Sequence, residues 1–162
     1  LSNFAARVIM KIMYGARMAR FDLLRPVQGL ARMITKWGVP QDDDLHRLMC
    51  YIRTTKHWHT VDWMGDPIDL VSPVVFTDSD NGGNGPLTQQ CTSCVLCGLR
   101  GPNSSFPISA QSKRQGCQST STTEAELAAC QFGVQNRGYL RLFSGKACVK
   151  DFVFLLPGWA CC

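Results

Sequence analysis

The chain has 162 residues, of which 45% are hydrophobic and 18% charged, enough for one ordinary domain or one small domain with an appendage. This balance excludes a disordered chain, and no apolar run is long enough to span a bilayer. The N-terminal stretch is not a signal peptide, because Arg7, Lys11, Arg17 and Arg20 interrupt it. Since the sequence begins with Leu1, we expect a piece of a longer protein.

The charge is unevenly distributed along the chain. Residues 1–60 carry ten basic and four acidic side chains, a net charge of +6, whereas residues 61–162 carry seven basic and eight acidic ones. A basic front half beside a near-neutral back half suits binding to nucleic acid. The alternative is a basic helix face that only meets solvent.

The first third of the chain predicts three amphipathic helices. The first covers 4–19, with apolar Phe4 and Ile9 at helical spacing and basic residues on the other side. The second covers 26–36, with Pro26 near its first turn, and the third opens at 40–44 and ends near Lys56.

The remainder predicts strands and one further helix. Strands are expected at 71–78, 92–99 and 106–112, joined as an antiparallel meander, with Pro73 indicating an edge or a bulge. A helix follows at 122–142, and 147–150 is a candidate fourth strand.

Three of the nine cysteines follow a C-x-x-C-x-x-C spacing: Cys91, Cys94 and Cys97. This spacing resembles part of an iron–sulfur or zinc motif and leaves a Cys-rich, metal-stabilised module open. The same residues also suit a strand with reduced, buried thiols. A metal module would need a fourth thiolate or imidazole nearby.

Two carboxylates suggest a divalent-ion site. Asp78 ends an apolar strand, where an aspartate is often only a turn former, and Glu126 lies near the start of a helix. Ser121 and Glu124 fit a capping box, which explains Glu124 and leaves Glu126 free to act elsewhere. Two carboxylates held close together repel each other unless a cation such as Mg²⁺ lies between them.

Four stretches, in this order, resemble the ribonuclease H domain of copia-type LTR retrotransposon Pol polyproteins. They correspond to that family's "SDADWAG", "TSGYVF", "PISWQSKKQ" and "SSTEAEY" stretches: residues 77–80, 92–96, 107–115 and 121–127. Upstream, residues 13–22 and 49–55 resemble that polyprotein's "LMYLAxxTRPD" and "ILRYLKGT" stretches. The resemblance covers roughly residues 6–143.

The resemblance implies an α/β, ribonuclease H-like three-layer fold, with a mixed sheet built from the three-strand meander and a parallel strand. Residues 1–60 would be a helical connection segment after a missing reverse transcriptase palm, and 61–162 a ribonuclease H-like domain, incomplete at its C-terminal end. The implied activity is hydrolysis of the RNA strand of RNA–DNA hybrids, with two Mg²⁺ or Mn²⁺ ions about 4 Å apart. The implied partners are nucleic acid and the rest of the polyprotein, in a cytoplasmic particle or the nucleus, without a membrane.

Matched position by position, Asp78 and Glu126 correspond to metal-binding carboxylates of the family, and Asp151 is the candidate third. Lys113 and Arg114, placed after the third predicted strand, are candidates for phosphate contacts, with solvated turn charges as the alternative. The family's Asn after the third carboxylate is absent here, so a catalytically degenerate remnant that at most binds nucleic acid stays open beside the enzyme.

Overall fold

A computed structural model describes residues 2–80, 90–116, 118–135 and 154–155. Residues 2–3 and 154–155 are described by their backbone alone. The chain divides into two compact units, a helical unit over residues 1–61 and a sheet unit over residues 62–162.

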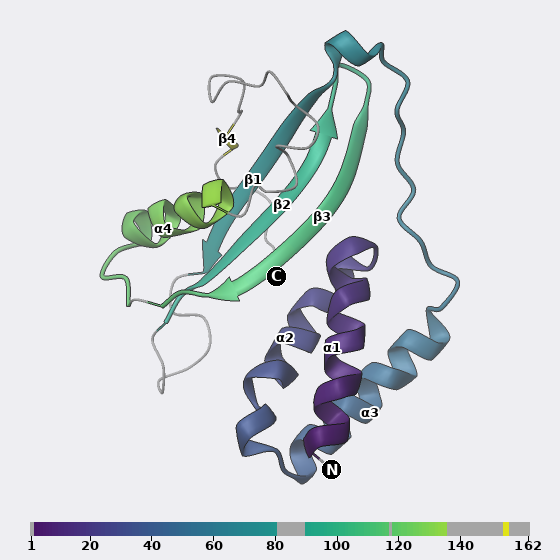
Figure 1. Cartoon of the computed structure of the whole chain (residues 1–162), viewed down its shortest axis with the longest axis vertical. Coiled ribbons are helices and arrows are strands. Elements are labelled where there is room, and N and C mark those ends of the chain that lie inside the picture. The colour runs from purple at the N-terminus through teal and green to yellow at the C-terminus, as the bar shows by residue number, and fades with distance from the viewer. Residues whose placement is uncertain (1, 81–89, 117, 136–153, 156–162) are drawn as a thin grey trace. The chain divides into compact units, whose positions relative to one another are not determined.

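The helical unit contains α1 (Ser2–Met18), α2 (Leu24–Arg32) and α3 (Val39–Thr54), shown in Figure 1. Short 3-10 turns join them, η1 (Phe21–Leu23) and η2 (Ile34–Lys36). All three helices lie close to their predicted positions, except that the second ends earlier and continues as η2. Gly38 and Pro40 set the start of α3, where the Gly38 amide donates to Gln41 Oε1 at 3.0 Å.

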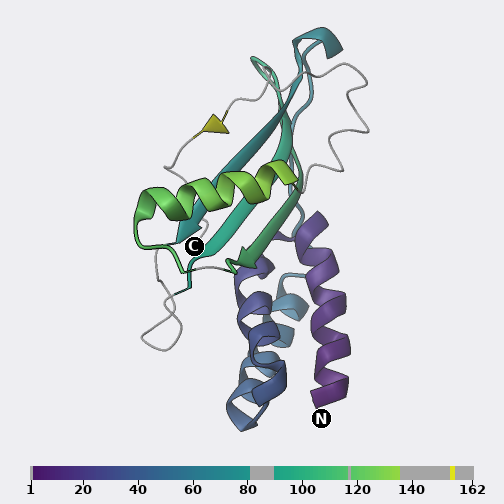
Figure 2. The same ribbon diagram turned by 60° about the vertical axis from the view of Figure 1, so that its left-hand side comes forward.

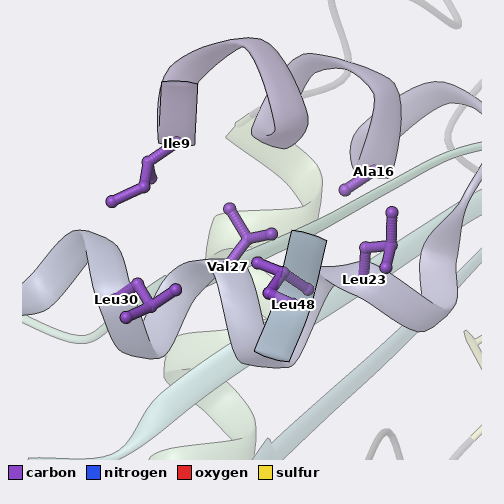
Figure 3. Close-up of a cluster of buried hydrophobic side chains, with 6 residues drawn as sticks. All are labelled: Ile9, Ala16, Leu23, Val27, Leu30 and Leu48. Carbon is purple, nitrogen blue, oxygen red and sulfur yellow. The ribbon is translucent and has the colours of Figure 1, made fainter. Parts of the chain in front are cut away.

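The core of the helical unit is a small apolar cluster to which each helix contributes. Figure 3 shows its buried members pointing toward one another: Ile9, Ala16, Leu23, Val27, Leu30 and Leu48. Phe4, predicted to belong to the apolar side of the first helix, is 69% exposed. The buried side of α1 instead carries Ala5, Ile9 and Ala16, so the apolar face of this helix is narrower than the sequence pattern predicted.

A polar network joins the end of α1 to the end of α3. The Arg20 guanidinium donates to Asp22 Oδ2 at 2.8 Å and to the Thr55 hydroxyl at 2.8 Å. Tyr51 Oη donates to the same Asp22 oxygen at 3.0 Å. Because Thr55 is buried, the bond from Arg20 to its hydroxyl forms in a partly dry environment, where it is stronger than at an open surface, whereas the bonds to Asp22 are exposed. The two upstream stretches that carry the family resemblance therefore meet in one hydrogen-bonded cluster.

The sheet unit is built on four strands in the order β3-β2-β1-β4 (Figure 1). The meander consists of β1 (Ser72–Asp80), β2 (Thr92–Arg100) and β3 (Ser105–Arg114), and each of its neighbouring pairs is antiparallel. A fourth strand, β4 (Phe154–Leu155), pairs in parallel with Val75 and Phe76. The expected mixed sheet is therefore present among the described residues, although β4 comes later than the predicted 147–150, which lie outside them.

The irregularity of the meander does not lie at Pro73. Pro73 pairs with Leu99 in regular register, and the bulge falls between Cys97 and Gly98 of β2. A Cβ atom on Gly98 would approach the Phe106 carbonyl oxygen to 2.7 Å, so only glycine fits there. On the other side of β1, the described pairing with β4 starts at Val75. Because Pro73 lies before this pairing, its missing N–H costs no hydrogen bond between β1 and β4.

One helix, α4 (Thr122–Gln135), packs across a face of the meander (Figure 2). Its buried side carries small residues at every fourth position: Ala125, Ala129 and Gly133. A Cβ atom on Gly133 would lie 2.6 Å from Thr77 Cγ2, so the helix backbone lies directly against β1. The predicted helix continued to Leu142, but residues after Gln135 lie outside the described part of the chain.

The fold is thus mixed α/β, with a three-strand antiparallel sheet, a helix on it and a helical segment before it. Among the residues with described structure, no helix is both long and apolar enough to cross a bilayer.

Candidate functional site

The first predicted carboxylate, Asp78, lies within β1 rather than at its end. It is half-buried and pairs with Cys94 of β2. Asp80 ends the strand, and its Oδ1 accepts a hydrogen bond from the Thr92 backbone amide. Asp80 therefore closes the ladder between β1 and β2, whereas no such bond is found for Asp78 among the described residues.

The start of α4 uses Glu124 as a cap. The Glu124 amide donates to Ser121 Oγ at 3.2 Å, and Glu124 Oε2 accepts from the Thr120 amide at 2.7 Å and from the Thr120 hydroxyl at 2.9 Å. The bond from the Thr120 backbone is the main reason that the pKa of Glu124 lies below its ordinary value. The predicted capping role of Ser121 and Glu124 is confirmed, with Thr120 as the residue to which the carboxylate reaches back.

Glu126 is in the opposite situation. It is half-buried, its Oε2 atom is shielded from solvent, and that atom has no hydrogen-bond partner among the described residues. Ser79 Oγ, on β1, is likewise shielded and without a partner in the described ranges. A shielded, unpaired carboxylate oxygen carries a desolvation cost of about 1–3 kcal/mol or more. Binding a cation offsets such a cost, so Glu126 fits the role of a divalent-ion ligand.

Packing shows where Glu126 lies on the sheet. Cys130, one helical turn after Glu126 on the same side of α4, has its Sγ 3.2 Å from Thr77 Oγ1. Gly133, further along, faces Thr77 and Val75. Moving toward the start of α4 therefore moves toward the end of β1, which places Glu126 near Ser79.

Asp78 and Glu126 are consequently at the same end of β1. Successive side chains of a strand leave opposite faces, and Thr77 faces α4, so Asp78 leaves the face away from the helix. A shared ion requires the two side chains to converge at the edge of β1. The third candidate, Asp151, lies outside the described residues, and the described part of the parallel strand follows it in sequence. In the described ranges, no three His, Cys, Asp or Glu side chains group as a metal site.

Gln115 holds the start of α4 on the sheet, a role that sequence reasoning did not assign. Its buried Nε2 donates to Ser93 Oγ and to the Ala125 carbonyl, both at 2.9 Å, while Oε1 accepts from Ser119 Oγ at 3.0 Å. Ser93 is the register partner of Ser79. This glutamine thus fixes the helix turn that carries Glu126 over the end of β1. Its place at the end of the "PISWQSKKQ"-like stretch was the available signal.

Lys113 and Arg114 are the last residues of β3, not part of a turn after it. Lys113 pairs with Ser93 and faces α4, with its Nζ 5.5 Å from the centre of the Phe132 ring. Arg114, the next residue, leaves the opposite face. A groove between β3 and α4 has Lys113 on its wall; we call it the β3–α4 groove. Its lining residues are Ser93, Lys113, Arg114, Gln115, Gly116, Ala128, Gln131, Phe132 and Gln135. Both cations line this groove, and their predicted phosphate contacts stay a prediction.

Among the described residues, Cys91, Cys94 and Cys97 do not gather into a metal site. Cys94 and Cys97 are three residues apart on β2, so their side chains leave opposite faces of the sheet. Cys91 is buried just before the strand. The reading as a strand with reduced thiols agrees with this geometry.

Comparisons with protein-family models, with curated proteins and with solved structures find no match to this chain.

Proposed function

We propose that the sheet unit is a ribonuclease H-like domain of retrotransposon origin, which hydrolyses the RNA strand of RNA–DNA hybrids with divalent ions. The observation that carries the proposal is the Glu126 carboxylate, whose shielded oxygen has no hydrogen-bond partner among the described residues, while Oε2 of Glu124, two residues earlier, accepts two bonds from Thr120 as a cap. The strand order and the parallel fourth strand agree with the fold that the resemblance implies.

Asp78, Glu126 and Asp151 are the residues that would hold the ions. When bound, Mg²⁺ supplies an activated water and stabilises the leaving oxygen. The chain itself contributes the placement of Glu126, through the bonds from Gln115 to Ser93 and to the Ala125 carbonyl. Lys113, which lines the β3–α4 groove, supplies a charge that attracts a phosphate backbone without reading its sequence.

The direct test is cleavage of an end-labelled RNA–DNA hybrid in Mg²⁺ by the full chain and by paired variants. Asp78→Asn and Glu126→Gln are expected to lower the cleavage rate at least about hundredfold, because each removes a metal ligand. Asp80→Asn and Glu124→Gln remove the same charge from residues that already have hydrogen-bond partners, and cleavage should change far less. Equal rates for the parent chain and Asp78→Asn would refute the catalytic assignment.

A second readout does not require activity. Glu126→Gln removes a shielded charge, so it should raise the thermal midpoint in EDTA and abolish the increase that Mg²⁺ gives the parent chain. The alternative function is a degenerate remnant that binds nucleic acid without cleaving it. It predicts that Mg²⁺ does not raise the thermal midpoint of the parent chain through Glu126. The basic helical unit would still bind nucleic acid in that case.

A further inference from the structure

One face of α1 carries a stripe of exposed side chains that contribute nothing to the core of the helical unit. The spacing of the stripe alternates between three and four residues, which keeps its members on one side of the helix. Its members are Phe4, Arg7, Lys11, Tyr14 and Met18. The stripe is opposite to the buried side of the same helix, which carries Ala5, Ile9 and Ala16.

The stripe carries charge of one sign. α1 contains Arg7, Lys11 and Arg17 and no acidic residue. Elsewhere in the helical unit, Arg20 pairs with Asp22 and Arg47 lies 3.5 Å from Asp44. The cations of the stripe are among those for which no ion pair is found in the described residues. A surface of this kind complements a polyanion, and its attraction falls as salt is added.

The stripe also exposes aromatic rings beside its cations. Tyr14 is 74% exposed and Phe4 is 69% exposed, and helical rise separates them by about 15 Å. Aromatic platforms interleaved with cations are the usual means of holding single-stranded nucleic acid, because bases stack on the rings while the backbone follows the charges. A duplex keeps its bases stacked internally and offers them no such contact.

We infer that this stripe of α1 binds single-stranded nucleic acid, with Arg7 and Lys11 on phosphates and Tyr14 stacked on a base. The observations favour this partner over a membrane, because cations interrupt the exposed apolar residues, and the continuous apolar side of α1 is already buried in its own unit. The surface is independent of the proposed nuclease site. It lies in the helical unit, whereas Asp78 and Glu126 belong to the sheet unit.

The test is fluorescence anisotropy of a labelled single-stranded oligonucleotide with the full chain carrying Asp78→Asn, in EDTA, over a series of salt concentrations. The double variant Arg7→Gln/Lys11→Gln should lower the salt slope by about 1.4 and weaken binding about twentyfold at 0.1 M salt. The matched control, Arg53→Gln/Lys56→Gln, removes the same charge from exposed positions at the end of α3. It should change the salt slope and the affinity much less. Tyr14→Ser should weaken single-strand binding at least about fivefold and leave duplex binding unchanged.

The inference is overturned if the control pair weakens binding as much as the α1 pair, because binding would then depend only on net charge. It is also overturned if Tyr14→Ser has no effect, or if the parent chain binds anionic vesicles and not the oligonucleotide. Since no metal is present and Asp78 is replaced, loss of cleavage cannot produce any of these results. Circular dichroism of each variant confirms that the helical unit is folded.

Discussion

Gly133→Ala tests the close contact on which the placement of Glu126 depends. The added methyl would lie 2.6 Å from Thr77 Cγ2, about 1 Å short of an ordinary carbon–carbon contact. Thr77 is held in place, since its Oγ1 contacts Cys130 Sγ at 3.2 Å, so relief requires either loss of that contact or a shift of α4 away from β1. Overpacking of this kind costs about 1–3 kcal/mol, while replacing a helical glycine with alanine returns about 1 kcal/mol.

The chain supplies a matched control in Gly29→Ala. Gly29 lies within α2, and an added Cβ there meets nothing within 4 Å. The same chemical change should therefore stabilise α2 by about 1 kcal/mol and destabilise α4 by about 1 kcal/mol. Hydrogen-exchange mass spectrometry measures the opening of the two helices separately, which matters because the two units need not unfold together.

A second substitution isolates the clash. Thr77→Ser removes the Cγ2 atom and keeps the hydroxyl, so Gly133→Ala should cost less in the Thr77→Ser background than in the parent chain. If the proposed nuclease is active, a shift of about 1 Å in α4 should lower cleavage about hundredfold in Gly133→Ala, and Gly29→Ala should leave it unchanged. Equal stabilisation of α2 and α4 by the two glycine replacements would refute the packing argument.

Three further outcomes are expected. Thr55→Val removes a buried hydroxyl that accepts a hydrogen bond from Arg20 and donates one to the Tyr51 carbonyl. In urea unfolding it should lower the stability of the helical unit by about 1–3 kcal/mol. The control, Thr54→Val, replaces an exposed residue and should cost less. Gln115→Leu should weaken amide protection at the start of α4 before it affects the rest of the sheet, and equal loss throughout the sheet unit would contradict its anchoring role. The bond from Arg20 holds the pKa of Asp22 below its ordinary value of 3.8, so the ionised carboxylate stabilises the folded state. This contribution to the free energy of unfolding is complete above pH 3.8 and is lost as the pH falls through the lower pKa that Asp22 has in the folded chain. In acid unfolding, the stability of Asp22→Asn should therefore fall less with decreasing pH than that of the parent chain.

Local chemistry accounts for what the sequence predicted well. The amphipathic helices and the cap at Ser121 and Glu124 depend on residues within one or two turns of each other, and the structure has them near the expected positions. The separation of Glu124 from Glu126 followed from the same local rule, because a capping box uses the first glutamate and leaves the second.

Long-range packing accounts for what the sequence missed. At Pro73 the bulge alternative is wrong, because Pro73 pairs with Leu99 in regular register and the bulge lies at Gly98, where the neighbouring strand comes close. The role of Gln115 depends on Ser93 and Ala125, twenty-two and ten residues away, and no local pattern indicates either partner. Phe4 has the helical spacing of the apolar side of α1 and is nevertheless exposed, because helical periodicity does not show how wide the covered face is.

The residues that carry the family resemblance fall into two physical classes. Arg20, Asp22 and Gln115 have partners in the folded chain, so they stabilise the structure whether or not any chemistry remains. Glu126 is different: its shielded oxygen has no such partner among the described residues, and a carboxylate in that position is expected to cost stability until a cation binds it. The structural residues therefore cannot distinguish an active nuclease from a degenerate copy. The response of Glu126→Gln to Mg²⁺ tests whether Glu126 belongs to an ion site, because only a bound ion turns the cost of that carboxylate into a gain, and the cleavage assay then tests whether that site is active.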